Sequence, residues 1–372
     1  MRLLLCGGGT AGHINPAIAI AEEVKCTDPN AEILFVGREG GLENEAILKA
    51  GFKLKTIKIQ GLRRSLSLTN LKSVYLALKA RGYAARIIND FSPDVILGTG
   101  GYVCWPIISS GQKMNIPTAL HESNITPGLT TRMLAGKCNK VFLNSDETKK
   151  YITKKAKAIT TGNPLRCDFN KISRAQARRI YGLKDSELMI LSFGGSIGAE
   201  KLNKVILDTI KSYSLVEKEI RHIHATGKRY YNEAEARYIN SKNGGCKILP
   251  YIEDMPTALR AADIVVCRCG AMTLSEIQQV GVAAILIPSP NVSDNHQYKN
   301  ALHLSERGAA TMIEEGKLTT ELLIEELKRL NFDKFGRKNR AKTLRALSKP
   351  NSAKTIAKEL FLLKYGNKKA AF

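Results

Sequence analysis

The stretch RLLLCGGGTAGHINP, residues 2–16, opens the chain and decides its fold. Residues 3–6 are typical of a buried strand, and the glycines that follow match the pattern G-x-G-x-x-G. Pro16 favours the start of a helix directly after this loop. This order predicts an α/β fold on a parallel sheet, with main-chain N–H groups that can bind a phosphate. The alternative is a tight strand-to-helix turn without a ligand.

Short β-rich apolar runs alternate with amphipathic segments along the whole chain, which is the pattern of repeated β-α-β units. The strands expected in the first half are 3–6, 33–36, 54–59, 95–98, 118–121 and 140–144. The pattern then starts again, with strands expected at 189–193, 222–226, 246–249, 264–267 and 284–287. Two doubly wound parallel sheets fit this better than one.

A break in the periodicity at TGNPLR, residues 161–166, indicates a domain boundary, and a polar basic helix extending to Arg179 follows it. The chain of 372 residues is long enough for two hydrophobic cores. We expect an N-terminal domain at 1–163, a C-terminal domain at 164–345 and a terminal segment at 346–372. The amphipathic helix expected at 352–363 would pack back on the N-terminal domain.

The composition excludes several classes of protein. A hydrophobic fraction of 44% is too high for a disordered chain. The eight cysteines include no CxxC pair, so neither a disulfide framework nor a zinc site is expected. No apolar run approaches the roughly 18 to 20 residues of a membrane span, and no signal-peptide core is visible. We therefore expect a cytoplasmic protein.

The chain is strongly basic, with 57 Lys+Arg against 34 Asp+Glu and a net charge of +23. This excess favours a polyanionic neighbour, either nucleic acid or an anionic membrane surface, but it also fits a generally lysine-rich surface. The sequence shows no helix-turn-helix, zinc-finger or aromatic RNP pattern. We therefore expect no nucleic-acid partner.

Two further glycine loops follow expected strands, GTGG at 98–101 and GGSIG at 194–198. The second precedes an expected helix, where main-chain N–H groups and the helix dipole suit a diphosphate. Ligands of such folds bind outside the carboxyl ends of the strands, so these loops indicate a cleft lined by strand ends. An NAD-linked oxidoreductase would explain the first loop but would leave the loops of the second half without a function.

The segment CRCGAMTLSE at 267–276 reads as a strand end, a glycine turn and a helix N-terminus, with Glu276 expected in the first turn of the helix. A glutamate there is often only a partner of the helix dipole, which is the alternative to ligand binding. The polar segment 288–300 enters another helix, and such loops at strand ends usually bind something.

Taken together, these motifs resemble the MurG family of peptidoglycan glycosyltransferases over nearly the whole chain. The matching motifs are GGGTAGHINP at 7–16, GTGGYVCWP at 98–106, HESNITPG at 121–128, TGNPLR at 161–166, GGSIGA at 194–199 and RCGAMTLSE at 268–276. The resemblance implies a GT-B fold of two Rossmann-like domains that face a central cleft. It also implies an inverting hexosyltransferase that moves GlcNAc from UDP-GlcNAc to undecaprenyl-linked muramyl-pentapeptide.

The resemblance also assigns donor-site residues by motif. Glu276 is implied to accept the ribose hydroxyls, Ile252 to pair with uracil through its main chain, and Gln297 to bind the sugar hydroxyls. The complete set is Thr10, Ala11, Gly12, Asn124, Arg166, Ser196, Ile252, Ala271, Met272, Thr273, Leu274, Ser275, Glu276 and Gln297. Asn124 would also bind the sugar, while Arg166 and Ser196 would bind the diphosphate. The sequence departs from the family at Ala11, Cys269 and His296.

Inverting transfer needs a base for the acceptor hydroxyl, and His13 is the first candidate. It follows the first glycine loop at a helix start, where the positive end of the dipole favours a neutral imidazole. A histidine that only stabilises the loop is one alternative, and Glu122 as the base is the other. Because helix N-termini, Ser196 and Arg166 can meet the leaving-group charge, we expect neither a metal nor a cofactor. The chain also contains no Asp-x-Asp.

Membrane association is expected from the segment 61–91, where basic residues interleave with apolar ones. Apolar side chains with a basic rim suit an anionic headgroup layer, and Trp105 could lie at the same surface. The alternative is an amphipathic core helix with solvated lysines. We expect a peripheral protein on the cytoplasmic face of the cell membrane.

Overall fold

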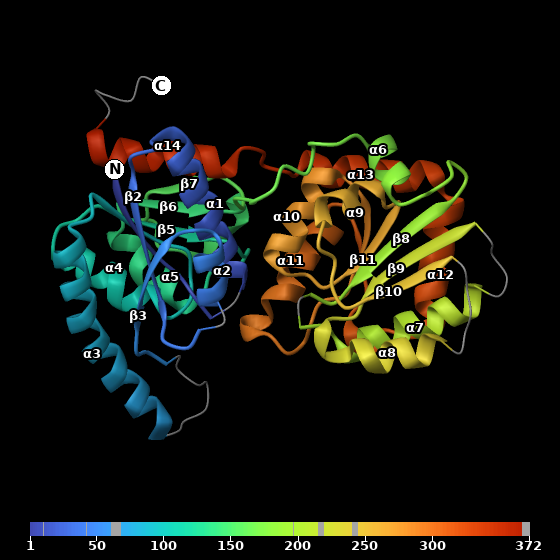
Figure 1. Cartoon of the computed structure of the whole chain (residues 1–372), viewed down its shortest axis with the longest axis horizontal. Coiled ribbons are helices and arrows are strands. Elements are labelled where there is room, and N and C mark those ends of the chain that lie inside the picture. Colours follow the sequence, from blue (N-terminus) through green and yellow to red (C-terminus); the bar gives the residue numbers. More distant parts are fainter. Residues whose placement is uncertain are drawn as a thin grey trace. The chain divides into compact units, whose positions relative to one another are not determined.

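The computed structural model describes residues 1–9, 11–41, 43–60, 68–195, 197–214, 219–239 and 245–366 (Figure 1). The chain divides into two compact units. The N-terminal unit comprises Met1–Arg166 and Lys349–Phe372, and the C-terminal unit comprises Cys167–Ser348. The chain therefore leaves the N-terminal unit once and returns to it for its last helix.

The N-terminal unit is built on a seven-stranded parallel sheet with the order β3-β2-β1-β4-β5-β6-β7. Its strands are β1 (Arg2–Cys6), β2 (Glu32–Arg38), β3 (Lys53–Ile57), β4 (Val95–Gly98), β5 (Thr118–Glu122), β6 (Lys140–Leu143) and β7 (Ala158–Thr160). Its helices are α1 (Ala11–Thr27), α2 (Glu43–Lys49), α3 (Leu68–Phe91), α4 (Cys104–Lys113), α5 (Leu129–Leu134) and α14 (Ser352–Tyr365).

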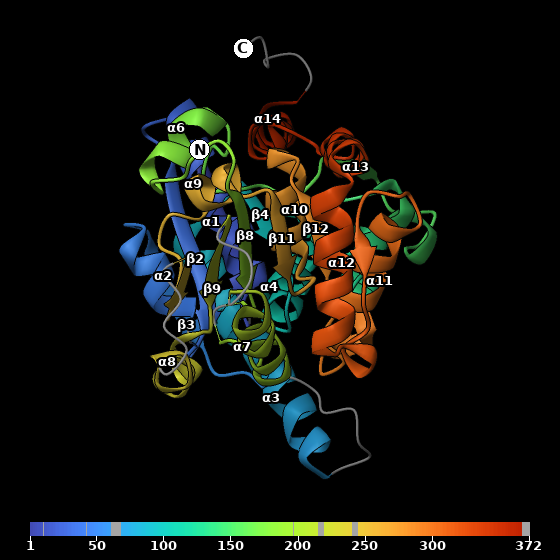
Figure 2. The ribbon, with the colours of Figure 1, turned by 90° about the vertical axis from the view of Figure 1, so that its right-hand side faces the viewer.

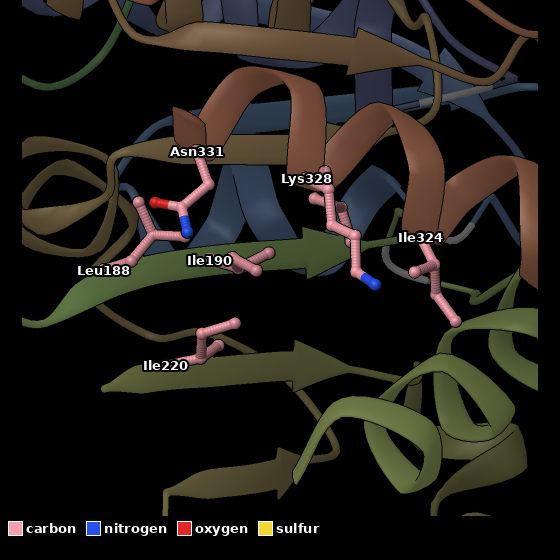
Figure 3. A pocket seen from close by; sticks show the side chains of 7 residues that line it. Leu188, Ile190, Ile220, Ile324, Lys328 and Asn331 are labelled. Atoms are coloured by element: carbon pink, nitrogen blue, oxygen red, sulfur yellow. The ribbon is translucent and has the colours of Figure 1, made fainter. Parts of the chain in front are cut away.

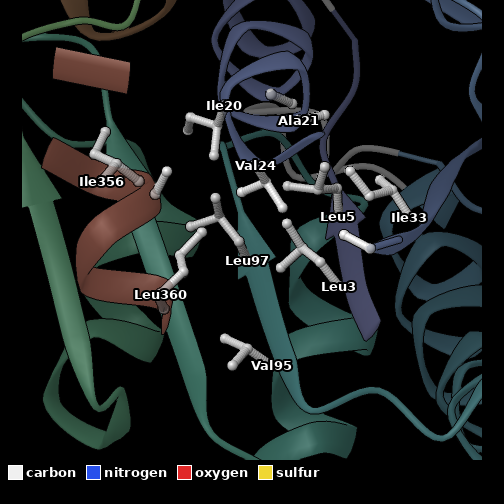
Figure 4. Packing of buried hydrophobic residues seen from close by; sticks show 14 of the residues in the cluster. Leu3, Leu5, Ile20, Ala21, Val24, Ile33, Val95, Leu97, Ile356 and Leu360 are labelled. Carbon is white, nitrogen blue, oxygen red and sulfur yellow. The ribbon is translucent and has the colours of Figure 1, made fainter. Parts of the chain in front are cut away.

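The residues of β1 alternate between two hydrophobic cores, because successive side chains of a strand point to opposite faces of the sheet. Leu3 and Leu5 join the core beneath α1 and α14, whereas Leu4 and Cys6 join the core beneath α3 and α4. Figure 4 shows Ile356 and Leu360 of α14 beside the strands and α1. The last helix of the chain thus completes one core of the N-terminal unit.

The C-terminal unit is built on a six-stranded parallel sheet with the order β10-β9-β8-β11-β12-β13. Its strands are β8 (Leu188–Phe193), β9 (Ile220–Ala225), β10 (Cys246–Leu249), β11 (Ile264–Cys267), β12 (Ala283–Leu286) and β13 (Thr311–Met312). Its helices are α6 (Arg174–Ile180), α7 (Glu200–Ser214), α8 (Tyr231–Ile239), α9 (Met255–Ala261), α10 (Ala271–Val280), α11 (His296–Ser305), α12 (Thr320–Phe332) and α13 (Lys334–Ala346). Helices α7 and α12 pack together over one face of this sheet (Figure 2).

Both sheets have the doubly wound order that the sequence predicts, so the predicted fold class is confirmed. Every strand expected from the sequence is present. The short strands β7 and β13 were not expected, because three and two residues are too few to show a periodic pattern. Among the described residues, no helix is long and apolar enough to cross a membrane.

Each sheet has one point at which the strand order reverses. In the N-terminal unit it lies between β1 and β4, and in the C-terminal unit between β8 and β11. Open α/β sheets bind their ligands outside the carboxyl ends of the strands at such switch points. The loops after β1, β4, β8 and β11 are therefore where a site is expected, and they contain the glycine motifs singled out from the sequence.

Candidate active site

The glycine loops after β1 and β4 are in direct contact within the N-terminal unit. The N–H of Gly8 donates to the carbonyl of Gly100 at 3.3 Å, and the N–H of Thr99 donates to the carbonyl of Cys6 at 2.9 Å. A Cβ on Gly101 would lie 2.1 Å from the Gly8 carbonyl oxygen, and Gly101 has a φ of +83°. Only glycine permits this approach, because a side chain there would both clash and strain the backbone.

His13, in the first turn of α1, packs on these loops. Its Nδ1 lies 3.0 Å from the carbonyl oxygen of Gly8. Since a carbonyl can only accept, Nδ1 carries the proton, and Nε2 is the proton-accepting nitrogen of the neutral ring. A Cβ on Gly100 would lie 2.7 Å from the ring carbon Cδ2. The two glycine loops therefore fix both the orientation and the tautomer of the imidazole.

A second histidine, His121 at the end of β5, is fully buried close to His13. Its Nε2 donates to the carbonyl of Gly162 at 3.3 Å. Burial lowers the pKa of His121 to about 4, and the nearby His13 adds a smaller effect in the same direction. His121 is therefore neutral at neutral pH. The sequence placed it in a motif but gave no sign of its burial beside His13.

Glu122, the alternative base, is buried and fully engaged by neighbouring groups. Its Oε1 accepts from the main-chain N–H and the side-chain amide of Asn124, at 3.1 and 3.3 Å. Its Oε2 accepts from the N–H of Gly128 at 3.0 Å and the hydroxyl of Thr131 at 2.8 Å. The carboxylate thus ties the loop after β5 to α5, and it positions Asn124.

The remaining predicted residues of this unit occupy different settings. Ala11 and Gly12 lie in the first turn of α1, and Thr10 is outside the described residues. Arg166 pairs with Glu22 of α1 at 3.0 Å, and both side chains are 38% exposed. An exposed ion pair of this kind contributes little to stability, so Arg166 can exchange Glu22 for a phosphate at small cost.

The loop after β8 in the C-terminal unit repeats the close packing of glycines. Gly195 and Gly198 have φ values of +90° and +85°, and a Cβ on Gly198 would lie 2.1 Å from the Thr226 carbonyl oxygen. The N–H of Gly198 donates to the Gly195 carbonyl at 3.0 Å. Helix α7 begins directly after this loop, at Glu200. Ser196, the predicted phosphate ligand here, lies outside the described residues.

Helix α10 begins at the carboxyl end of β11 without a side-chain cap. Its N-cap residue is Gly270, which supplies no side-chain hydrogen bond. The predicted residues Ala271, Met272 and Thr273 form its first turn, and Leu274 and Ser275 follow as buried residues. The Ser275 hydroxyl donates to the Ala271 carbonyl at 3.0 Å, so this side chain serves the helix itself. A ligand at this end would meet main-chain N–H groups and the positive end of the helix dipole.

Glu276 lies in the second turn of α10, not in the first turn as expected from the sequence. The structure starts this helix at Ala271, and its first turn contains no acidic residue. The prediction was wrong because helix starts are hard to place when a glycine, and not a polar side chain, occupies the N-cap. Partnership with the helix dipole falls off within the first turn, so it is a poor explanation for Glu276.

The Glu276 carboxyl is partly buried, and desolvation raises its pKa to about 7. No ion pair or hydrogen bond from the described part of the chain engages it. Tyr251 is near enough for Glu276 to help raise the pKa of its hydroxyl, although burial has the largest effect there. A partly desolvated acidic group without a partner is typical of a ligand site.

Ile252 follows Tyr251 directly after β10. Its side chain is only 3% exposed, so it anchors the segment in the unit. Within the residues that the structure describes, no hydrogen bond uses the main-chain N–H or carbonyl of Ile252. A donor and an acceptor side by side are what the edge of a pyrimidine base requires.

Gln297 and Arg268 organise the loop that enters α11. The Gln297 Oε1 accepts from the N–H groups of Cys269 and Ser289, at 3.1 and 3.0 Å, so its Nε2 is the atom left for a ligand. Arg268 donates to the carbonyls of Ile287 and Pro288, both at 3.3 Å, and pairs with Glu315. The sequence did not single out Arg268, since its partners lie far away along the chain.

A small apolar cavity lies elsewhere in the C-terminal unit, between α12 and the first residues of β8 and β9 (Figure 3). Its volume is about 20 Å³, and Leu188, Ile190 and Ile220 are among its lining residues. Pockets for drug-sized ligands are usually about 300 to 1,000 Å³. This cavity therefore does not hold a nucleotide, and the switch-point loops remain the candidate site.

Two family models match the chain. The glycosyltransferase family 28 N-terminal domain matches residues 3–143, and the glycosyltransferase family 28 C-terminal domain matches residues 189–360. Each match covers the switch-point loops of one unit.

Curated relatives match over most of the chain. A UDP-N-acetylglucosamine--N-acetylmuramyl-(pentapeptide) pyrophosphoryl-undecaprenol N-acetylglucosamine transferase of Acetivibrio thermocellus is 40% identical over 356 residues, 96% of either chain. The enzyme of the same name from Desulforamulus reducens is 40% identical over 363 residues, 96% of this chain and 97% of the relative. The family resemblance inferred from the motifs is thus confirmed.

Solved structures agree with this result. The crystal structure of Acinetobacter baumannii MurG superposes with a TM-score of 0.80 at 27% identity, over 97% of this chain and 99% of that one. A UDP-GlcNAc 2-epimerase of Neisseria meningitidis superposes with a TM-score of 0.67 at 14% identity, over 97% of this chain and 100% of that one. At that identity the second match shows only a shared fold.

Proposed function

Because the chain belongs to glycosyltransferase family 28, among the UDP-N-acetylglucosamine--N-acetylmuramyl-(pentapeptide) pyrophosphoryl-undecaprenol N-acetylglucosamine transferases, we propose that it catalyses this transfer with inversion. The donor is UDP-GlcNAc, and the acceptor is the lipid-linked muramyl-pentapeptide of peptidoglycan synthesis. The observation that carries the proposal is the partly buried Glu276 carboxyl without a partner in the described part of the chain, on a helix that begins after Gly270 at a switch point.

Donor recognition belongs to the C-terminal unit. The main chain of Ile252 pairs with the uracil edge, and the Glu276 carboxylate accepts the ribose hydroxyls. The N–H groups at the start of α10 and of the glycine loop before α7 bind the diphosphate, and Ser196 contributes its hydroxyl. The Gln297 amide, held by Cys269 and Ser289, donates its Nε2 hydrogens to the sugar. Asn124, which the Glu122 carboxylate positions in the N-terminal unit, stays a predicted ligand of the sugar.

Proton removal belongs to the N-terminal unit. The Nε2 nitrogen of His13 takes the proton of the acceptor hydroxyl, while the hydroxyl oxygen forms a bond to the anomeric carbon of GlcNAc. The bond from that carbon to the diphosphate breaks on the opposite face, and UDP leaves with the electron pair, so the anomeric configuration inverts. The hydrogen bond from Nδ1 to the Gly8 carbonyl holds the imidazole in the tautomer that this step needs.

The leaving diphosphate is stabilised by helix N-termini and by Arg166. Preorganised N–H donors in a site that excludes water can stabilise developing charge strongly. Arg166 contributes when its guanidinium exchanges Glu22 for the phosphate. We infer that the chemistry requires no divalent ion.

We further propose that the chain docks on an anionic membrane surface on the cytoplasmic face, where its acceptor lies. The apolar side chains of Leu78 on α3, and of Leu129 and Met133 on α5, are each more than half exposed. The exposed cations Lys79 and Arg132 are next to Leu78 and Met133 in the sequence. The Arg81 guanidinium lies 5.6 Å from the centre of the Trp105 ring. Exposed apolar side chains with a basic rim fit an anionic headgroup layer. The residues 61–67 of the predicted membrane segment lie outside the described part of the chain.

Transfer of radiolabel tests the reaction. The purified chain is incubated with labelled UDP-GlcNAc and a lipid-pyrophosphoryl-muramyl-pentapeptide, with labelled UDP-glucose as the control donor. Label from UDP-GlcNAc should enter the lipid fraction, and label from UDP-glucose should not. Equal transfer from both donors, or transfer from neither, would refute the proposed function.

A further inference from the structure

The corner between α12 and α13 in the C-terminal unit presents two exposed aromatic side chains. Phe332 ends α12 and is 80% exposed, and Phe335 lies at the start of α13 and is 76% exposed. No other large hydrophobic side chain among the described residues is exposed as much. Single exposed apolar residues need no explanation, but two aromatic rings three residues apart indicate an interaction site.

Helix α13 adds a row of cations to these rings. Its sequence contains six Lys or Arg residues and no carboxylate. Lys334, Lys338 and Lys342 are exposed, and none of them forms an ion pair with any residue that the structure describes. At 3.6 residues per turn the three lysines fall within an arc of about 80°, with Phe335 at its margin. The row is about 12 Å long, at a rise of about 1.5 Å per residue.

The corner is held rigidly on the unit. Arg337 donates to the carbonyl of Leu330 at 3.1 Å and lies 3.8 Å from the Asp263 carboxylate. The carboxylate of Asp333 accepts from the N–H of Gly336 at 2.7 Å and so caps α13. The remaining acidic groups on the outer side of α12, Glu321 and Glu325, lie two to three turns away from Phe332. The two exposed rings and the lysine row follow one another along this corner, and together they are named the Phe332–Lys342 surface.

This surface lies near the amino ends of the strands of the C-terminal unit, whereas the donor loops of the same unit lie at the carboxyl ends. Asp263, which contacts Arg337, directly precedes β11, whereas the donor loop directly follows it. The cavity shown in Figure 3, whose lining includes Lys328 and Asn331 just before Phe332, opens at the first residues of β8 and β9. A partner bound here would leave the donor loops of this unit uncovered.

We propose that the Phe332–Lys342 surface is a docking site for an anionic lipid bilayer, with the two rings inserted among the lipids and the lysines at the headgroups. Lysine is depleted in protein–protein interfaces, whereas lysine clusters beside aromatic rings suit anionic headgroups, so the surface favours a bilayer over an acidic protein. The two rings protrude and need no complementary pocket. This contact is separate from the surface of α3 and α5 proposed above.

A tryptophan reporter in the full chain tests the proposal. Phe335→Trp is made in a Trp105→Phe background, so that the reporter is the only tryptophan. Ile180→Trp in the same background is the control, because Ile180 is 68% exposed in the same unit but at the end of α6. Vesicles of phosphatidylglycerol with phosphatidylcholine are compared with vesicles of phosphatidylcholine alone, each with and without brominated lipid.

The emission of the Phe335→Trp variant should shift to shorter wavelength and be quenched by brominated lipid, but only on anionic vesicles, while the Ile180→Trp control should respond to neither. Replacing Lys334, Lys338 and Lys342 by Gln should weaken vesicle binding about fivefold for each lysine.

Three outcomes would overturn the proposal. If the tryptophan at position 335 stays exposed to water on a vesicle-bound chain, the proposal is wrong, but the membrane surface proposed on α3 and α5 is not affected. Protection of that reporter ring by an acidic protein, without any response to vesicles, overturns it as well. A chain that binds no vesicles refutes both membrane proposals, while the transfer assay tests the reaction independently.

Discussion

The Nδ1 nitrogen of His13 lies 3.0 Å from the carbonyl oxygen of Gly8, in a loop that is itself held by Gly100. The orientation of the imidazole therefore depends on the contact between two glycine loops. The Cys104 thiol supports this contact, because it lies 3.1 Å from the Gly100 carbonyl and 3.2 Å from the Cys6 carbonyl. Any side chain that separates the loops should displace the base.

Gly101→Ala is predicted to lower kcat at least a hundredfold while the chain still folds and binds UDP-GlcNAc. The added Cβ would lie 2.1 Å from the Gly8 carbonyl oxygen and 3.2 Å from Nδ1 of His13. Gly82→Ala in α3 is the matched control, since a Cβ there meets nothing within 4 Å. Steady-state kinetics and calorimetric donor binding distinguish the two effects. Equal activity of both variants would contradict the role of the loop contact.

Glu276→Ala is predicted to raise the KM for UDP-GlcNAc well over tenfold. Two hydrogen bonds to a charged acceptor are lost, each worth about 1.5 to 3 kcal/mol. Since burial raises the pKa of Glu276 to about 7, the donor KM of the wild type should also rise as the pH falls through 7. Glu276→Gln should abolish this pH dependence. Unchanged donor affinity in a folded variant would limit Glu276 to a structural role.

Mild acid is predicted to destabilise the C-terminal unit through a buried pair of histidines. The Ser192 hydroxyl lies 2.7 Å from Nε2 of His222 and 2.8 Å from Nδ1 of His224. Burial lowers the pKa of both histidines, that of His224 from 6.5 to about 4. The unfolded chain therefore binds protons that the folded chain does not, and stability is lost as the pH falls from about 6.5 to about 4. The loss should reach about 3 kcal/mol for His224.

Urea unfolding between pH 4.5 and 7.5 measures this effect. His224→Gln should reduce the slope of the unfolding free energy with pH. The opposite contribution of Glu276 is the same in the wild type and the variant and cancels in the comparison. A His224→Gln slope equal to that of the wild type would mean that this pair is not the acid-sensitive element.

Transfer is predicted to continue in EDTA, because helix N-termini and Arg166 supply the charge that meets the diphosphate. The measurement is the initial rate after dialysis against the chelator, with and without added Mg²⁺ or Mn²⁺. Modest stimulation by an added ion is compatible with this mechanism. Complete loss of activity, restored by one divalent metal, is not.

The fold was largely predictable, because its strands are strongly apolar runs separated by glycine turns. Expected strands such as 95–98 and 264–267 coincide with β4 and β11. Short-range patterns could not reveal β7 and β13, which are held by pairing with β6 and β12 and not by their own periodicity. The placement of Glu276 failed for a related reason, since the N-cap glycine of α10 gives no polar signal.

The motifs predicted which residues lie at the switch points but not how those residues are engaged. The ion pair of Arg166 with Glu22 spans 144 positions of the chain, and the contacts of Arg268 with Ile287 and Glu315 are also long-range. The four hydrogen bonds of Glu122 are local, yet only the folded loop shows that both oxygens are engaged. Pairings of this kind depend on tertiary structure, so the sequence left the choice between His13 and Glu122 open.

Steady-state kinetics of His13→Ala beside Glu122→Ala tests most directly whether His13 takes the acceptor proton. His13→Ala should lower kcat by about 10² to 10⁴ with the donor KM much less changed, the usual contribution of a general base. Glu122→Ala should instead disturb Asn124 and α5, with loss of stability and a raised KM. Near-normal kcat for His13→Ala, together with lost kcat for a folded Glu122→Ala, would contradict this mechanism and identify Glu122 as the base.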